Sequence, residues 1–283
     1  MTGKDVRMGR LFGNGSPVIV AADHGSYMGP FAGIEDLPHQ ISQFKKADAF
    51  LVMPGMAKRC TAFFGQKDAP LCIIRVNWAA HYCKPHMKGF SKTKKDSYYE
   101  KGYNEKLCSV KYAVSLGADI VIASLLLGTD EEANTRNITQ FGEFVSEADS
   151  LGVPLIGEYI PFDGIDRYTG DVGDLLLGIR ACAEFGADMI KTVFVEQFEQ
   201  VAGSSVVPAL ALGGGVFEKP SDAFRLAQKA LKKGAKGVVY GRNVICAKNP
   251  TSFLDCLLGV VKNGADPVEA EKDYLASIAG GKR

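Results

Sequence analysis

The chain has 283 residues, 46% of them hydrophobic and 23% charged, and a formal net charge of +1. These values are ordinary for a globular protein, and so small a net charge gives no general attraction to nucleic acid or to a membrane. No apolar run reaches the ~18 residues that span a bilayer. The first residues lack the apolar core of a signal peptide, and the seven cysteines form no C-x-x-C pair. We therefore expect a cytoplasmic protein with reduced thiols.

Short apolar runs recur along the chain and predict eight strands. Three similar phrases each place a Gly where a helix would end, followed by an apolar run rich in β-branched residues. They are SLGADIVIASLLL (115–127), EFGADMIKTVFV (184–195) and KKGAKGVVYG (232–241). A glycine at the left-handed cap of a helix, followed by such a run, predicts a helix-to-strand junction. The other strands are predicted at Pro17–Ala22, Ala49–Pro54, Leu71–Val76, Pro154–Tyr159 and Pro208–Leu212.

Helical patterns lie between most of these strands. Apolar residues at three- and four-residue spacing predict helices at Tyr99–Leu116, Asn134–Leu151, Asp174–Phe185, Ser221–Lys233 and Pro250–Val261. Eight strands alternating with helices over about 250 residues are typical of the (β/α)8 TIM barrel, an α/β fold. An open doubly wound sheet is the alternative. Because no Pro- or Gly-rich linker divides the chain, residues 1–283 are predicted to form a single domain.

One segment, residues 77–106, interrupts this alternation after the third strand. From residue 84 to residue 106 it holds seven Lys against three acidic residues, a net charge of +4. We expect a long Lys-rich loop beside the active site, acting either as a lid or only as a solvated surface loop. His81, Cys83 and His86 lie in it and are a weak candidate for a zinc site. Ordinary loop side chains explain them better, so no metal is predicted.

The carboxyl ends of the predicted strands carry polar or glycine-rich groups. In a TIM barrel the catalytic groups come from these ends. The groups are Asp23-His24-Gly25, Glu158-Tyr159, Lys191-Thr192, Gly213-Gly214-Gly215 and Gly241-Arg242-Asn243. Their coincidence at one edge of the barrel favours an enzyme.

Lys191 stands out because it lies inside the apolar run ADMIKTVFV. Burying an unpaired ammonium group is costly, and desolvation favours the neutral amine. A neutral buried amine can attack a ketone or aldehyde to form a Schiff base. The alternative is a lysine paired with a carboxylate inside the barrel, such as Asp23.

The glycines of the last two strand ends predict a phosphate site. Gly213, Gly214, Gly215 and Gly241 offer backbone N–H groups free of side chains, and Arg242 adds a charged donor. The loops after strands seven and eight form the usual phosphate site of this fold. Plain turn chemistry is the alternative. A dinucleotide site is disfavoured because G-x-G-x-x-G does not occur at the first strand-to-helix turn.

Five phrases resemble the archaeal-type class I fructose-bisphosphate aldolase family. This family includes 2-amino-3,7-dideoxy-heptulosonate synthase and the autoinducer-2 processing thiolase. The phrases are ADHGSYMGPFAGIED (22–36), EYIPFDG (158–164), ADMIKT (187–192), ALGGG (211–215) and YGRNVICAKNP (240–250). The resemblance extends from residue 17 to about residue 271. It implies a TIM barrel that assembles as a homo-oligomer, a pentamer or a decamer.

The resemblance also implies roles for individual residues. Lys191 would form the Schiff base, Tyr159 would be the general acid/base, and Asp23 would handle protons or hold the substrate. The substrate and its phosphate would be bound by His24, Gly213, Gly214, Gly215, Gly241 and Arg242. The sequence departs from the family after Tyr159, where Ile160-Pro161-Phe162 replaces the usual Pro-Arg-Gly.

We therefore predict a class I aldolase or transaldolase that acts on a phosphorylated ketose or a related keto compound. No cofactor or metal is expected, because the protonated imine is the electron sink. One alternative is a thiolase or lyase acting on a phosphorylated dione. Another is a catalytically silent barrel that binds a phosphorylated ligand. If Tyr159 does not carry the proton, Glu158 or Asp23 would be next.

Overall fold

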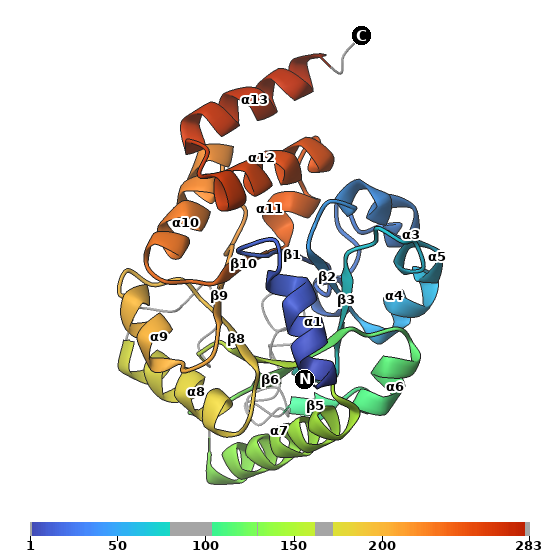
Figure 1. Ribbon diagram of the computed structural model, residues 1–283, viewed down its shortest axis with the longest axis vertical. Coiled ribbons are helices and arrows are strands. Elements are labelled where there is room, and N and C mark those ends of the chain that lie inside the picture. Colours follow the sequence, from blue (N-terminus) through green and yellow to red (C-terminus); the bar gives the residue numbers. More distant parts are fainter. Residues whose placement is uncertain (1, 80–103, 129, 162–171, 281–283) are drawn as a thin grey trace, which may run out of the picture.

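The computed structural model describes residues 2–79, 104–128, 130–161 and 172–280, and they form a closed parallel barrel (Figure 1). Around the barrel the order is β1-β10-β9-β8-β7-β6-β3-β2, which confirms the TIM barrel over the open sheet. All eight strands lie within the predicted ranges. They are β1 (Val18–Ala21), β2 (Ala49–Val52), β3 (Leu71–Arg75), β6 (Ile120–Leu125), β7 (Leu155–Tyr159), β8 (Met189–Thr192), β9 (Ala209–Leu212) and β10 (Gly237–Tyr240).

Helices cover the outside of the barrel. The longer ones are α1 (Gly3–Phe12), α7 (Glu131–Leu151), α8 (Val172–Glu184), α10 (Pro220–Lys232), α12 (Pro250–Asn263) and α13 (Pro267–Gly280). The shorter ones are α2 (Gly25–Met28), α3 (Leu37–Gln40), η1 (Ile41–Phe44), α4 (Pro54–Arg59), α5 (Thr61–Phe64), α6 (Val110–Ser115), α9 (Phe198–Ser204) and α11 (Arg242–Ile245). The four helices predicted from Asn134 onwards are confirmed to within three residues at each end. Helices α1 and α13 were not predicted.

The helix predicted at Tyr99–Leu116 is wrong over part of its length. Within the described residues only Val110–Ser115 are helical, as α6, while Asn104–Lys106 form strand β5. This strand pairs antiparallel with β4 (Asn77–Ala79), with Asn77 opposite Lys106. Backbone pairing with β4 therefore overrides the helical spacing. The Lys-rich loop predicted at 77–106 begins and ends in this pair. Residues 80–103, including His81, Cys83 and His86, lie outside the described residues.

Three glycines confirm the predicted helix-to-strand junctions. Gly117, Gly186 and Gly234 have φ of 94°, 106° and 99°. This left-handed region is open to glycine at little cost and disfavoured for residues with a side chain. Each glycine ends a helix three residues before a strand begins.

Acidic residues fasten the amino ends of the strands to their neighbours. Asp48, Asp119 and Asp188 directly precede β2, β6 and β8. Their Oδ2 atoms accept backbone N–H groups of Val18 at 2.8 Å, Cys72 at 2.9 Å and Leu155 at 2.8 Å. The same carboxylates pair with Lys262 at 2.8 Å, Arg10 at 2.9 Å and Lys4 at 2.7 Å. Asp119 and Asp188 belong to the repeated Gly-Ala-Asp phrase, so in these two cases the Asp of that phrase ties its strand to the neighbouring strand.

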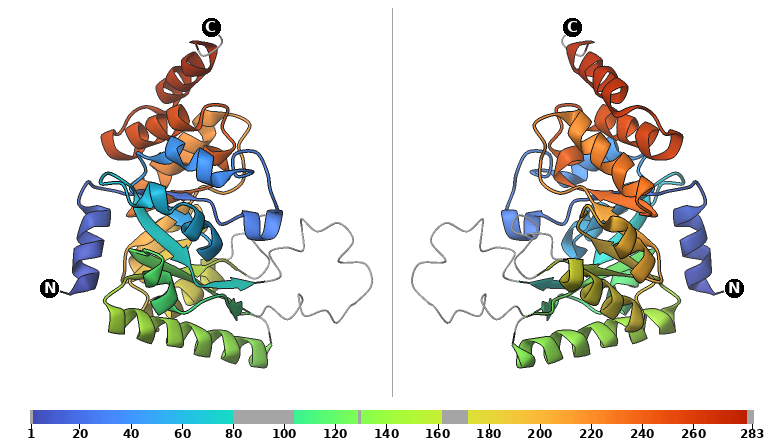
Figure 2. Two further views of the ribbon diagram at one scale, coloured as in Figure 1. Left: turned by 90° about the vertical axis from the view of Figure 1, so that its right-hand side faces the viewer. Right: turned by 90° about the vertical axis from the view of Figure 1, so that its left-hand side faces the viewer.

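Helix α1 lies at this amino end, whereas β4 and β5 project from the opposite end of the barrel (Figure 2). Helix α1 is held there by Lys4, which pairs with Asp149 and Asp188, and by Arg7, whose Nη1 donates to the Gly152 carbonyl at 3.1 Å. The carboxyl end is thus left to the loops and short helices that follow the strands. In the described part of the chain, no helix is long and apolar enough to cross a bilayer.

Candidate active site

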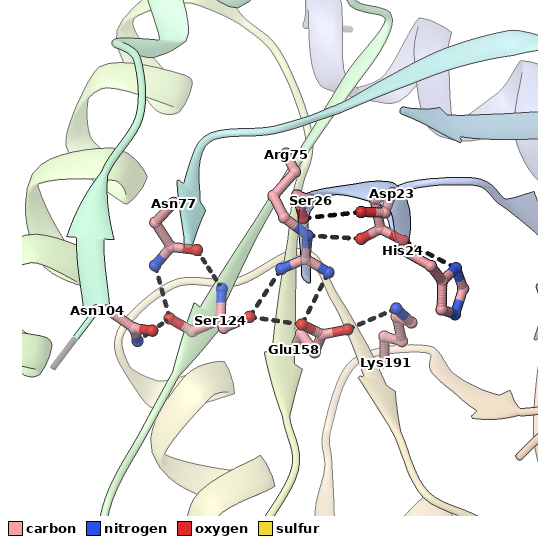
Figure 3. Close-up of polar contacts among 9 residues, drawn as sticks. All are labelled: Asp23, His24, Ser26, Arg75, Asn77, Asn104, Ser124, Glu158 and Lys191. Atoms are coloured by element: carbon pink, nitrogen blue, oxygen red, sulfur yellow. Dashed lines mark hydrogen bonds and ion pairs between the residues drawn. The ribbon is translucent and has the colours of Figure 1, made fainter. Parts of the chain in front are cut away.

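Four charged side chains lie buried together at the carboxyl end of the barrel (Figure 3). Asp23 follows β1, Arg75 ends β3, Glu158 lies on β7 and Lys191 on β8. They are only 3%, 6%, 3% and 5% exposed. Glu158 and Lys191 are register partners on neighbouring strands, so their side chains point to the same face. The charges balance, since two carboxylates meet two cations.

Arg75 is the centre of this network. Its Nε donates to Asp23 Oδ2 at 2.6 Å, its Nη1 donates to Ser124 Oγ at 2.8 Å, and its Nη2 lies 2.8 Å from Glu158 Oε2. A planar guanidinium can hold two carboxylates at once because its donors form a rigid fork. Arg75 therefore keeps Asp23 and Glu158 at fixed positions on opposite sides of the barrel interior.

Lys191 is paired with Glu158. Its Nζ lies 2.5 Å from Glu158 Oε1, while Ser124 Oγ donates to Glu158 Oε2 at 2.5 Å. A lysine paired inside the barrel was the alternative interpretation of Lys191, with Asp23 as the example; the partner is Glu158. The pairing also places a carboxylate where it can carry the ammonium proton while the amine reacts.

The network keeps both carboxyl groups ionised. Burial raises the pKa of Glu158, but Arg75 and Lys191 outweigh it and lower the pKa to about 2. Asp23 behaves in the same way, with burial opposed by Arg75 and Lys191 and the pKa lowered overall. The adjacent His24 differs: burial, only partly offset by Asp23, lowers its pKa to about 4, so its imidazole is neutral at pH 7.

Tyr159 lies on the other side of the barrel wall, which corrects the expectation that it meets Lys191. Successive strand residues point to opposite faces, so the inward side chain of Glu158 places Tyr159 outward. Its ring occupies the space left by Gly178 of α8, where an added Cβ would lie 2.0 Å from the Tyr159 Cζ atom. The structure therefore does not bring the Tyr159 hydroxyl together with the lysine. Glu158, one residue earlier, takes that place.

Two asparagines at the base of the β4–β5 pair hold the end of β6. Asn77 Nδ2 donates to the Ser124 carbonyl at 2.8 Å, and Ser124 N donates to Asn77 Oδ1 at 2.8 Å. Asn104 Nδ2 donates to the same carbonyl at 2.7 Å. Ser124 is thereby fixed where its hydroxyl can serve Arg75 and Glu158.

The predicted phosphate residues form a second part of the site, after β9 and β10. Asn243 holds the glycine loop, because its Nδ2 donates to the carbonyls of Gly213 at 3.0 Å and Gly215 at 2.7 Å. Gly214 has φ of 67°, and a Cβ on Gly214 or Gly215 would meet no atom within 4 Å. Open space over these two residues suits a bound group. Gly213 is instead required by packing, since its Cβ would lie 2.7 Å from the Tyr240 ring.

His24 and Arg242 lie next to this loop. A Cβ on Gly241 would lie 2.3 Å from His24 Cε1, so the glycine makes room for the imidazole. Within the described ranges, the buried Nε of Arg242 and Nδ1 of His24 have no hydrogen-bond partner, although Nδ1 lies 3.6 Å from Asp23 Oδ1. Buried donors without partners are costly, and a bound anion would satisfy that of Arg242. Across the described ranges, no three His, Cys, Asp or Glu side chains gather as metal ligands.

Sequence reasoning missed Arg75 and Ser124. The signal for Arg75 was present, since it is a charged residue inside the apolar run LCIIRV, as Lys191 is inside its own strand. Ser124 in IVIASLLL carried a weaker form of the same signal. Glu158 was considered only as a substitute for Tyr159.

Comparison with known proteins identifies the family. The DeoC/LacD family aldolase model matches residues 17–247. An uncharacterized aldolase of Saccharolobus solfataricus is 31% identical over 96% of this chain and 99% of its own length. The 2-amino-3,7-dideoxy-D-threo-hept-6-ulosonate synthase 1 of Archaeoglobus fulgidus is 30% identical over 99% of both chains. The crystal structure of an archaeal fructose 1,6-bisphosphate aldolase superposes with a TM-score of 0.74 over 92% of this chain and 99% of that one, at 22% identity. The chain therefore belongs to the DeoC/LacD aldolase family and is an aldolase-type lyase.

Proposed function

We propose that this protein is a class I aldolase or transaldolase that makes or breaks a carbon–carbon bond in a phosphorylated ketose or related keto compound. Lys191 is the nucleophile and Glu158 its proton partner. The observation that supports this most strongly is the contact of 2.5 Å between Lys191 Nζ and Glu158 Oε1 on adjacent strands. The relative named as a heptulosonate synthase is consistent with a keto sugar as substrate.

Formation of the imine uses this pair twice. The Lys191 ammonium passes one proton to Glu158 as its nitrogen adds to the substrate carbonyl, and a second proton moves from that nitrogen to the carbonyl oxygen to give a neutral carbinolamine. Glu158 then returns the proton to the carbinolamine hydroxyl, which leaves as water. The product is a protonated imine beside the Glu158 carboxylate, so the site carries the same charges as before. General acid–base catalysis by one positioned carboxyl group covers both transfers.

Cleavage changes the charge of the site. The hydroxyl on the carbon β to the imine carbon loses its proton and becomes a carbonyl. The bond between the α and β carbons breaks, and its electron pair neutralises the imine to an enamine. Glu158 now faces a neutral enamine instead of a cation. Loss of that cation raises the proton affinity of Glu158, so it is best able to hold the released proton at this step. Asp23 keeps its partner Arg75 throughout and serves to hold the network.

The glycine loop and Arg242 are proposed to bind the substrate phosphate. The support is the open space over Gly214 and Gly215 and the unpartnered buried Nε of Arg242. The adjacent His24, whose imidazole is neutral, would add a hydrogen bond to the phosphate without adding charge.

The lysine is tested by trapping the imine. A panel of phosphorylated ketoses that includes fructose 1,6-bisphosphate is incubated with the protein and borohydride. Reduction should inactivate the protein, and peptide mass mapping should place the adduct on Lys191. Lys191→Arg keeps the charge but cannot form an imine, so it should abolish labelling and turnover. Lys272→Arg, an exposed lysine paired with Glu269, is the matched control. No adduct with any ketose, or an active Lys191→Arg variant, would favour a silent phosphate-binding barrel.

The phosphate site is tested with the same ketoses. Arg242→Ala removes a charge-assisted hydrogen bond and should weaken the binding of phosphorylated substrates by roughly 1.5–3 kcal/mol. The binding of unphosphorylated analogues of the same sugars should be weakened much less. KM values for each pair measure the difference, and equal losses for both members of a pair would contradict the assignment.

Two expectations stay predictions. A homo-oligomer, pentameric or decameric, and a cytoplasmic location are implied by the resemblance and the composition alone. Sedimentation of the purified protein would measure the first.

A further inference from the structure

The outward position of Tyr159 leaves the aldol step without the tyrosine that the family resemblance implied. A proton must leave the substrate hydroxyl when the carbon–carbon bond breaks, and Glu158 is already engaged by Lys191, Ser124 and Arg75. A hydroxyl group between the substrate hydroxyl and Glu158 would connect them. The inference that follows rests on the proposed aldolase function.

Tyr27 is a tyrosine close to this network. It lies on α2, a single helical turn that begins two residues after Asp23. Ser26 Oγ donates to the Asp23 carbonyl at 2.9 Å and Tyr27 N donates to the His24 carbonyl at 3.1 Å, so the turn is tied to the end of β1. The Tyr27 ring packs against that of His24, with centroids 5.6 Å apart. Because His24 lies over Gly241, Tyr27 stands near the junction of the charged network and the phosphate loop.

Charged residues of both parts of the site influence Tyr27. It interacts electrostatically with Asp23, Arg75 and Glu158 of the network and with Arg242 beside the glycine loop. Burial, reinforced by Asp23, raises the pKa of Tyr27 well above its ordinary value. The phenol therefore stays protonated in the free protein, and it can accept one proton only as it passes on another.

We propose that Tyr27 relays the proton between the substrate hydroxyl and Glu158. In cleavage, the substrate O–H proton moves to Tyr27 Oη while the Tyr27 proton moves to the Glu158 carboxylate. At the same time the substrate C–O bond becomes a carbonyl, the carbon–carbon bond breaks, and the electron pair of that carbon–carbon bond moves towards the imine to form the enamine. Tyr27 ends unchanged and Glu158 ends protonated. In condensation each transfer runs in reverse, and Tyr27 protonates the oxygen of the incoming aldehyde.

The test compares two tyrosines that differ in where they point. Tyr27→Phe removes the proposed relay, and Tyr159→Phe is the matched control on the far side of the barrel wall. Both are assayed with the phosphorylated ketose that the wild-type protein cleaves. Tyr27→Phe should lower kcat for cleavage by about 10²–10⁴-fold, the usual contribution of a proton-transfer group. Tyr159→Phe should stay within a few fold of wild type.

Two further readouts separate a relay from a structural role. Tyr27→Phe should still be labelled on Lys191 by borohydride, and it should still exchange hydrogen with solvent at the enamine carbon of the ketone product. Both reactions need only Lys191 and Glu158. If Tyr27→Phe cleaves the ketose within tenfold of the wild-type rate, the relay is wrong. The relay is also wrong if Tyr27→Phe loses both borohydride labelling and cleavage. If the wild-type protein is not labelled on Lys191, the aldolase proposal itself fails, which is a different result.

Discussion

Carboxylates lie at both ends of the barrel, but their partners differ between the two ends. At the amino end, Asp48, Asp119 and Asp188 accept backbone N–H groups and pair with cations that approach from the surface. At the carboxyl end, the carboxylates of Asp23 and Glu158 are held by the side chains of Arg75, Ser124 and Lys191. A carboxylate that binds the backbone has its partner fixed by the fold. Glu158 is instead held by buried side chains and can exchange a proton with Lys191, so the carboxyl end is the one suited to chemistry.

The largest effect should come from Arg75→Met, which tests the carboxyl end. Removing one partner of a buried ion pair leaves uncompensated charge and typically costs 3–5 kcal/mol. Here two carboxylates lose their shared partner, so we expect a loss in that range or above it, measured by urea unfolding at pH 7. Arg75→Lys keeps the positive charge but not the forked guanidinium donors, so its free energy of unfolding should fall by less. An Arg75→Met variant as stable as wild type would show that the network is not held together by this residue.

Acid unfolding sharpens the same comparison. In the folded protein the pKa of Glu158 is lowered from 4.5 to about 2, so its contribution to stability is present above about pH 4.5 and is lost as the pH falls towards 2. Without Arg75 the folded-state pKa of Glu158 and Asp23 should rise. Arg75→Lys, which stays folded more readily, should therefore unfold in acid at a pH no lower than wild type, and Arg75→Met at a clearly higher pH.

A smaller effect is expected at the amino end. Asp188→Ala leaves the buried N–H of Leu155 without its side-chain acceptor, at a cost of about 1–3 kcal/mol. Lys4→Met removes only the partly exposed cation and should cost less than about 1 kcal/mol. Neither variant should change kcat or borohydride labelling once folded. A selective loss of activity in Asp188→Ala would mean that the two ends are coupled.

The sequence allowed most of the barrel to be predicted because each strand has a local signal. Gly117, Gly186 and Gly234 mark helix ends through backbone geometry that a side chain would strain, and an apolar run follows each. The helix expected over 99–116 was wrong in its first part, because the pairing of β5 with β4 is a contact between residues distant in sequence. Local periodicity carries no information about it.

The site was predicted less completely, for a geometric reason. Glu158 and Tyr159 are adjacent, so one faces the barrel interior and the other the helices, and sequence alone does not say which. The register of Glu158 with Lys191 decides it. Gly178 provides a second clue that becomes visible only in three dimensions, since its missing side chain is where the Tyr159 ring lies. Arg75 was overlooked although its signal equalled that of Lys191.

The balance of the four buried charges also bears on how this barrel can evolve. A mutation that removes any one of Asp23, Arg75, Glu158 or Lys191 leaves a net charge inside the protein, which is costly to bury. Two compensating substitutions, one acidic and one basic, restore neutrality at much lower cost. During evolution, an acidic and a basic residue of this set should therefore be kept or lost together. A descendant that abandons the chemistry would be expected to lose an acid and a base together, and such a double loss would mark the change of function in its sequence.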